Sequence, residues 1–141
     1  MADFEQATAD YVGFFLDITD DSVEGFRALA APEVRYRDPL MDEQGIDNVV
    51  KAMHGWFADL LDIRFEVHSS AVSGQRGHLH WHMHFRIKKL PKRQWLVDGM
   101  TRVEFDDSGK VVEVQDYWDA APFMEAFPVL GVFARLIKRL M

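Results

Sequence analysis

The chain has 141 residues, enough for one domain with a hydrophobic core, and its 48% hydrophobic and 28% charged residues are typical of a soluble globular protein. The net charge is −7 and no block of Lys and Arg occurs in the folded part, which argues against binding to nucleic acid. The absence of cysteine excludes disulfides, cysteine-bound zinc and a cysteine nucleophile.

The first helical signals occur close to the start of the chain. Apolar residues at helical spacing predict a helix over residues 3–17. N-capping side chains and a following proline predict a second helix over residues 22–31. Residues 33–38 are expected to form a short strand. After a loop over residues 42–45, a strongly apolar face predicts a third helix over residues 46–61.

The hydrophobic period then changes to two, which indicates strands. Alternation predicts strands over residues 63–68, 78–88, 95–105 and 111–119, with a turn at 107–110 before the last of them. Helices followed by a strand meander favour an α+β fold, in which the helices cover one face of an antiparallel sheet.

Residues 122–141 form an apolar C-terminal extension, with a helix expected over about residues 122–139. Its basic end, with Arg135, Lys138 and Arg139, suits the negative end of a helix dipole. We interpret the extension as part of one domain that spans residues 1–141. We expect it either to cover a pocket as a lid or to contact a second copy of the chain in a dimer. The alternative is an anchor in a membrane interface.

The strongest functional signal is a pair of carboxylates on apolar strand faces. Asp38 follows Tyr36 at a spacing of two, and Asp116 lies between Val114 and Trp118 at the same spacing. An inward carboxylate is costly unless it is paired, hydrogen-bonded or neutralised, and proteins usually accept that cost at a functional site. The pattern predicts a pocket with acid–base groups inside it.

Each carboxylate also has a purely structural interpretation. An Asp before a proline at a strand end is common turn chemistry, so Asp38 could serve only to bond nearby backbone amides. Asp116 could be a buried ion-pair partner of Arg35 or Arg37. The sequence leaves these alternatives open.

A stripe of four histidines, His78, His80, His82 and His84, shares one face of the predicted strand 78–88. Residues two apart on a strand are separated by roughly 6.6–7 Å, so we expect that neighbours could share a metal ion only with strain, and we predict no metal ligands. The inward apolar residues of the neighbouring strands favour the outer face of the sheet for the stripe, and the alternative is that one of the histidines lines the pocket.

The order of elements and a few motifs resemble the nuclear transport factor 2-like superfamily, which has a cone-shaped α+β fold, and within it the ketosteroid isomerase and SnoaL-like branch. The resemblance covers about residues 5–120. It rests on the pair Asp38-Pro39, on Gly45 before the third helix, and on Phe105 followed by residues 109–112 before the last strand.

This resemblance implies that Asp38 occupies the position of the proton-transferring base. The oxyanion-hole Tyr and Asp of the isomerases fall on Phe14 and Thr101, so the usual oxyanion hole is absent and steroid isomerisation is not expected. Tyr11, one turn earlier, could partly replace the missing Tyr. SnoaL-like cyclases use an acidic residue on the late strands as general acid or base, and Asp116 resembles it. In this superfamily the outer sheet face often forms a homodimer contact, which we expect here.

We therefore predict a homodimeric protein that binds a small hydrophobic molecule, with no nucleic-acid partner. The N-terminal segment resembles neither a signal nor a transit peptide and no run of about 18 apolar residues occurs, so a cytoplasmic location is expected.

If the protein is an enzyme, it is a proton-transfer catalyst that needs no cofactor, such as an isomerase, dehydratase, cyclase or epoxide hydrolase. The alternative is a non-catalytic ligand-binding or dimerisation module. The predicted catalytic residues are Asp38 and Asp116. The predicted ligand-binding residues are Tyr11, Phe14, Tyr36, Met53, Phe57, Trp81, Phe85, Trp95, Thr101 and Trp118.

Overall fold

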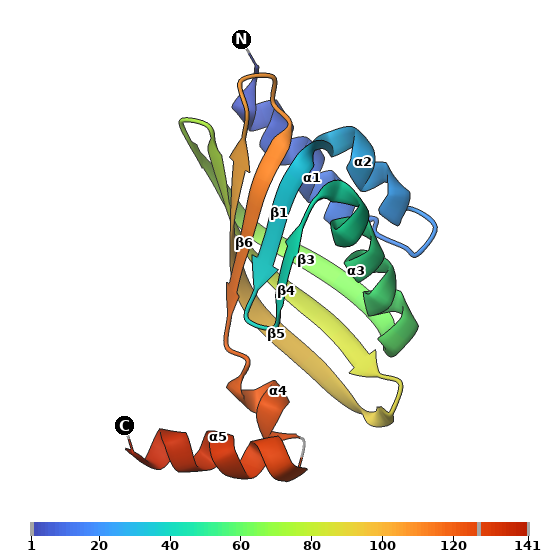
Figure 1. Cartoon of the computed structure of the whole chain (residues 1–141), viewed down its shortest axis with the longest axis vertical. Coiled ribbons are helices and arrows are strands. Elements are labelled where there is room, and N and C mark those ends of the chain that lie inside the picture. Colours follow the sequence, from blue (N-terminus) through green and yellow to red (C-terminus); the bar gives the residue numbers. More distant parts are fainter. Residues whose placement is uncertain (1, 127, 141) are drawn as a thin grey trace.

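The computed structural model describes residues 2–126 and 128–140, with the backbone only for residues 128–131, 133 and 134. The N-terminal helices lie together on one side of a strongly curved sheet (Figure 1). They are α1 (Phe4–Leu16), the short 3-10 helix η1 (Val23–Gly25), α2 (Phe26–Leu29) and α3 (Ile46–Asp59). Within the described ranges, no helix is long and apolar enough to cross a membrane.

The sheet is mostly antiparallel, as the alternating pattern predicted. The described chain forms it from six strands: β1 (Ala30–Asp38), β2 (Met41–Gln44), β3 (Leu60–Ser73), β4 (Arg76–Ile87), β5 (Leu90–Phe105) and β6 (Val111–Trp118). Their spatial order is β2-β1-β6-β5-β4-β3, and β1 runs parallel to β6 while the other neighbours are antiparallel. The α+β prediction is confirmed.

Two predicted elements near β1 differ in the structure. The expected second helix over residues 22–31 is shorter, because Ala30 and Ala31 are buried and already belong to strand β1. The expected loop over residues 42–45 contains β2, which pairs back onto β1. Arg35 of β1 donates two hydrogen bonds to Asp42 of β2, at 2.9 and 2.7 Å, and these bonds hold the hairpin closed.

The inner face of the sheet carries the core. Leu79, Trp81 and Phe85 of β4 are buried, while the histidines between them lie on the opposite face, as predicted. Gly99 of β5 lets the Trp81 ring lie directly against the backbone, since a Cβ atom at Gly99 would be 2.3 Å from a ring carbon. The pairing of β4 with β5 therefore fixes the position of Trp81.

The C-terminal extension contains two helices in place of the single predicted one. They are α4 (Ala121–Glu125) and α5 (Pro128–Leu140); Phe127, inside the predicted helix, lies outside the described residues. The Phe123 ring of α4 contacts the Trp95 ring of β5, with centroids 5.5 Å apart. Helix α5 packs mainly on α4 and extends away from the sheet (Figure 1), and Lys138 forms an ion pair with Glu125 at 2.8 Å.

We predict that Gly99→Ala destabilises the fold by about 1–3 kcal/mol, because the added methyl group must displace the Trp81 ring or the backbone. Gly13→Ala is the matched control: it lies inside α1 with open space around its Cβ position, and it should stabilise by about 0.5–1 kcal/mol. Urea unfolding measures both changes. A Gly99→Ala variant as stable as the native chain would contradict the close approach.

Candidate functional site

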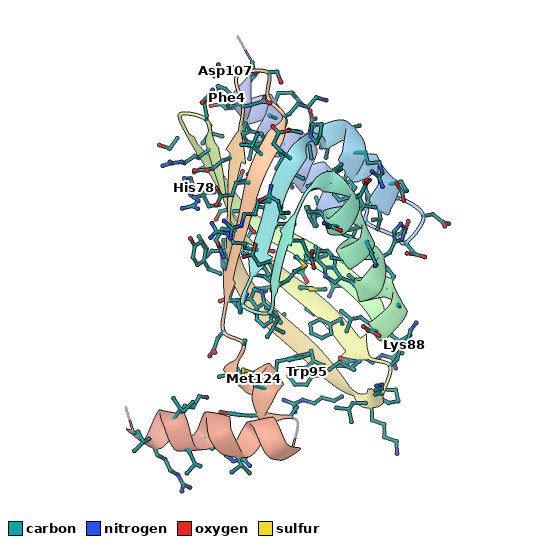
Figure 2. The ribbon with its side chains drawn as sticks, viewed as in Figure 1. Phe4, His78, Lys88, Trp95, Asp107 and Met124 are labelled. Carbon is teal, nitrogen blue, oxygen red and sulfur yellow. The ribbon has the colours of Figure 1, made fainter. Side chains whose placement is uncertain are left out.

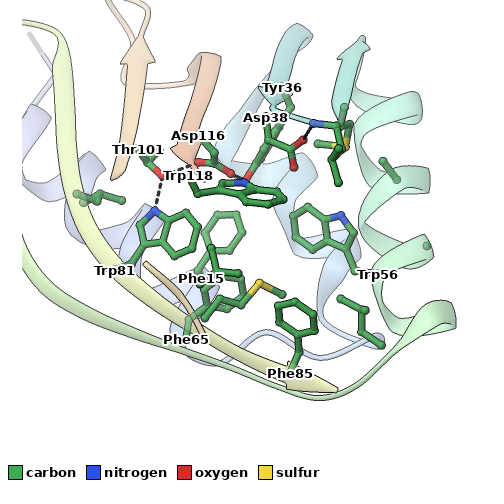
Figure 3. A pocket seen from close by; sticks show the side chains of 18 of the residues that line it. Phe15, Tyr36, Asp38, Trp56, Phe65, Trp81, Phe85, Thr101, Asp116 and Trp118 are labelled. Atoms are coloured by element: carbon green, nitrogen blue, oxygen red, sulfur yellow. Dashed lines mark hydrogen bonds between the residues drawn. The ribbon is translucent and has the colours of Figure 1, made fainter. Parts of the chain in front are cut away.

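A cavity of about 420 Å³ lies between the inner face of the sheet and helices α1 and α3 (Figure 3). This volume suits a small organic ligand, and most of the walls are apolar. The lining residues are Tyr11, Val12, Phe15, Tyr36, Asp38, Leu40, Met41, Ala52, Gly55, Trp56, Asp59, Leu60, Phe65, Val67, Leu79, Trp81, Met83, Phe85, Val97, Thr101, Asp116, Trp118 and Phe123.

Asp116 is the polar centre of this cavity. Its side chain accepts a hydrogen bond from the Thr101 hydroxyl at 2.5 Å on one oxygen and from the Tyr36 hydroxyl at 2.7 Å on the other. The Trp81 indole donates in turn to Thr101 Oγ1 at 2.7 Å, so a chain of hydrogen bonds crosses the cavity wall (Figure 3). These bonds satisfy a carboxyl group that is only 8% exposed.

Burial raises the pKa of Asp116 to about 7, and the nearby charge of Asp38 adds to that rise. The hydrogen bonds from Thr101 and Tyr36 act in the opposite direction on this pKa, because they favour the ionised form. The carboxyl group is therefore poised to hold or release a proton near neutral pH, a property typical of acid–base catalysts.

Strand order explains how the sequence assembles this network. β6 lies between β1 and β5, so both flanking strands can supply donors to one of its side chains. Thr101 is the direct cross-strand partner of Asp116, and Tyr36 pairs with Val114 two residues away on the same face. Period-two alternation on three adjacent strands thus directs the three polar side chains inward together.

Two tyrosines flank the carboxyl group. Tyr11 and Tyr36 are both 2% exposed, and burial raises the pKa of each well above its ordinary value. The charge of Asp116 raises both pKa values further. Both phenols therefore stay protonated at neutral pH, and the Tyr36 hydroxyl donates its hydrogen bond to Asp116.

Asp38 ends β1 at another part of the same wall. One of its oxygens accepts a hydrogen bond from the Leu40 backbone amide at 2.7 Å, which is the expected turn chemistry, yet the half-buried side chain also lines the cavity. Burial raises the pKa of Asp38, while hydrogen bonds from the Leu40 and Met41 amides lower it. Turn formation and exposure to the cavity occur together at this residue.

The ion-pair interpretation of Asp116 does not hold. Arg35 is bound to Asp42, and Arg37 donates to Glu113, a neighbour of Asp116 on the same strand. Glu113 lies on the opposite side of β6 from Asp116, because odd and even residues alternate across a strand. The two arginines are therefore engaged elsewhere, and the hydroxyl groups of Tyr36 and Thr101 are the polar partners of Asp116.

The structure brings most of the predicted site residues to the cavity and leaves four away from it. The residues that line it are Tyr11, Tyr36, Asp38, Trp81, Phe85, Thr101, Asp116 and Trp118. The residues that do not line it are Phe14, Met53, Phe57 and Trp95. Phe14 packs on Phe26, Met53 is fully buried in the core, and Trp95 stacks on the Phe85 ring.

Sequence reasoning missed several aromatic wall residues. Phe15 lines the cavity in place of its neighbour Phe14, and Trp56 does so in place of Phe57. Phe65 also lines it, and here a signal existed, because the alternation of its strand already placed it inward. Phe123 extends the wall from the C-terminal helices, which the local sequence pattern does not reveal.

Residues 12–114 match the SnoaL-like domain family, so the chain belongs to this family of the nuclear transport factor 2-like superfamily. A search of curated proteins finds no match. The predicted family and the predicted cone-shaped fold, with N-terminal helices packed on a curved sheet, are confirmed, and two C-terminal helices stand where one extra helix was predicted.

Solved structures share this fold at low identity. A candidate SnoaL-like polyketide cyclase from Jannaschia sp. CCS1 has a TM-score of 0.76 at 17% identity, over 89% of this chain and 94% of that one. An NTF2-like protein of unknown function from Burkholderia pseudomallei has a TM-score of 0.74 at 17% identity, over 88% and 96%. A ketosteroid isomerase-like protein from Catenulispora acidiphila, in complex with trimethylamine, has a TM-score of 0.69 at 13% identity, over 82% and 86%.

We predict that Asp116→Asn gains stability relative to the native chain as the pH rises from 5 to 8. The raised pKa of Asp116 means that the folded state keeps a proton that the unfolded state loses above about pH 4. The native chain therefore loses stability as the pH rises toward 7, by a few kcal/mol as an order of magnitude, and the amide variant does not.

Urea unfolding at pH 5 and pH 8 measures this difference. Asp42→Asn is the matched control. Because Arg35 lowers the pKa of Asp42, this substitution should change the free energy of unfolding by the same amount at both pH values. If Asp116→Asn also changes the free energy of unfolding by the same amount at both pH values, the assignment of a raised pKa to Asp116 is wrong.

Proposed function

We propose that this protein binds a small hydrophobic molecule in the cavity and catalyses a proton transfer on it with Asp38 and Asp116. The observation that carries the proposal is the buried, hydrogen-bonded Asp116, whose pKa is raised to about 7 in an apolar pocket. A second carboxyl group, Asp38, lines the same pocket in a more polar environment.

The two environments assign different roles to the two carboxyl groups. Burial raises the pKa of Asp38, which makes its carboxylate a stronger base, while the Leu40 and Met41 amides favour the ionised form; Asp38 therefore serves as the base that removes a proton from a carbon next to a carbonyl group. Asp116 is largely buried and is protonated in a large fraction of molecules at neutral pH, so it serves as the acid toward the carbonyl oxygen. This chemistry needs no cofactor.

The walls define the class of substrate. Three indole rings, of Trp56, Trp81 and Trp118, face the cavity with several phenylalanines, so the ligand is apolar and of a size to fill about 420 Å³. Proton transfer next to a carbonyl group is the shared step of isomerisation, dehydration and aldol-type cyclisation. Candidate cyclases and isomerases among the similar structures fit this class of reaction.

The second candidate is a non-catalytic ligand-binding or dimerisation module. It is favoured by the outer face of the sheet, where Leu96, Met100 and Tyr117 are 57%, 48% and 53% exposed. Met100 and Tyr117 are cross-strand partners and form a contiguous apolar surface. We propose that this face pairs two copies of the chain, each a single domain over residues 1–141, in a cytoplasmic homodimer.

We predict that the protein accelerates hydrogen–deuterium exchange next to the carbonyl group in members of a panel of small aromatic and alicyclic ketones. Asp38→Asn should lower that exchange rate by about 10²–10⁴-fold, because the base is removed. Asp42→Asn is the matched control, since Asp42 is an exposed strand carboxylate bound to Arg35 outside the cavity. NMR in D₂O follows the exchange.

The control should exchange at the native rate. Exchange that persists unchanged in both Asp38→Asn and Asp116→Asn would rule out the catalytic roles and favour the ligand-binding module.

We predict that Phe123→Ala weakens binding of the fluorescent dye 1-anilinonaphthalene-8-sulfonate in the cavity roughly fivefold. Phe123 contributes an aromatic wall, and losing such a contact costs about 1 kcal/mol. Leu136→Ala on the exposed part of α5 is the control and should leave the dye affinity unchanged. Equal affinities of the two variants would contradict a role of α4 in the pocket.

A further inference from the structure

Three imidazoles and a carboxylate come together on the outer face of the sheet, opposite the cavity. His80 and His82 of β4 point away from the cavity, and Asp98 of β5 is the direct cross-strand partner of His82. His68 of β3 places its ring beside both histidines, with centroids 5.3 and 4.2 Å away. Figure 2 labels His78 of the same stripe, on the side of the sheet away from the helices.

Two imidazole nitrogens converge on one oxygen atom. His80 Nε2 lies 2.6 Å from Asp98 Oδ1, and His82 Nε2 lies 3.2 Å from the same oxygen. One ligand atom from each of the three residues lies within 4.8 Å of the other two. Ligand atoms around a tetrahedral zinc ion are about 3.3–3.4 Å apart, given Zn–N distances of 2.0–2.1 Å, so the spacing of this set is close to the spacing that a zinc ion requires.

From this geometry we infer that His80, His82 and Asp98 form a binding site for a divalent transition-metal ion. Two imidazoles and one carboxylate suit Zn²⁺, Ni²⁺ or Cu²⁺ better than Mg²⁺ or Ca²⁺, which prefer oxygen ligands. This inference changes the sequence-based expectation of no metal ligands. Histidines two apart on a strand point to the same side, and a residue of the next strand completes the set without bending the backbone.

The surroundings allow an ion to enter and to be held. In the single chain, the side chains of His80, His82 and Asp98 are 37%, 29% and 68% exposed, so solvent reaches all three. His68 occupies an irregularity of β3, between the pairs Val67–Trp81 and Ser69–His80, and such bulges often redirect a side chain. Three protein ligands leave a coordination position that His68 or water can fill.

The other histidine of the stripe on this part of β4 is engaged differently. His84 Nε2 lies 2.6 Å from Glu66 on β3, and its cross-strand partner on β5 is Leu96, which has no ligand atom. His84 therefore shares the strand, the face and the exposure of His82 without belonging to the convergent set. It is the matched control for the metal site.

The test is calorimetric titration of Zn²⁺ into the untagged full-length chain at pH 7.5, with Co²⁺ absorption spectra as a second readout of ligand geometry. We expect one ion per chain. His80→Gln, His82→Gln and Asp98→Asn should each weaken the affinity for Zn²⁺ at least about tenfold. A loss of this size follows even when the residue removed only supports a metal ligand. His84→Gln should bind as the native chain does.

The site is absent if the native chain binds no Zn²⁺, or if His84→Gln weakens binding as much as His82→Gln does. A stoichiometry of one ion for two chains would also overturn the intrachain site. Circular dichroism of each metal-free variant verifies that it is folded. Because the three side chains lie on the surface opposite the cavity, this outcome is independent of the proposed catalytic function.

Discussion

The buried carboxyl group of Asp116 constrains the arrangement around it more than any other side chain. An unpaired carboxyl group in an apolar pocket would cost several kcal/mol, so it requires donors on both sides. Thr101 on β5 and Tyr36 on β1 provide them, and Trp81 on β4 holds Thr101 in place. Four of the six strands in the described chain must therefore keep their register for this one group to be satisfied.

The same constraint separates the two faces of the sheet. Apart from Asp116, the residues that bond it and Asp38 at the end of β1, the inward residues of the sheet are mostly apolar, and many charged groups lie on the outer face. There Arg37 and Arg102 share Glu113, and the histidines pair with Glu66 and Asp98. A cavity with few charges keeps the local dielectric low. That low dielectric is what moves the pKa of Asp116 toward neutrality.

Strand patterns predicted more of this site than helix patterns did. Alternation of period two is rigid, so it placed Asp38, Thr101 and Asp116 on the inner face from the sequence alone. A helix has no such fixed direction, because its rotation depends on packing partners, and α1 accordingly presents Phe15 to the cavity while α3 presents Trp56. Cross-strand register is not local either, so the meeting of His82 with Asp98 could not be predicted from the sequence.

The most direct test of this account is a ¹³C NMR titration of the carboxyl carbons in protein labelled at aspartate, with Asp116→Asn used to assign the resonance. The account predicts an apparent pKa of about 7 for Asp116, because its burial outweighs the hydrogen bonds that favour ionisation. An apparent pKa near 4, the ordinary value of an exposed aspartate, would contradict it.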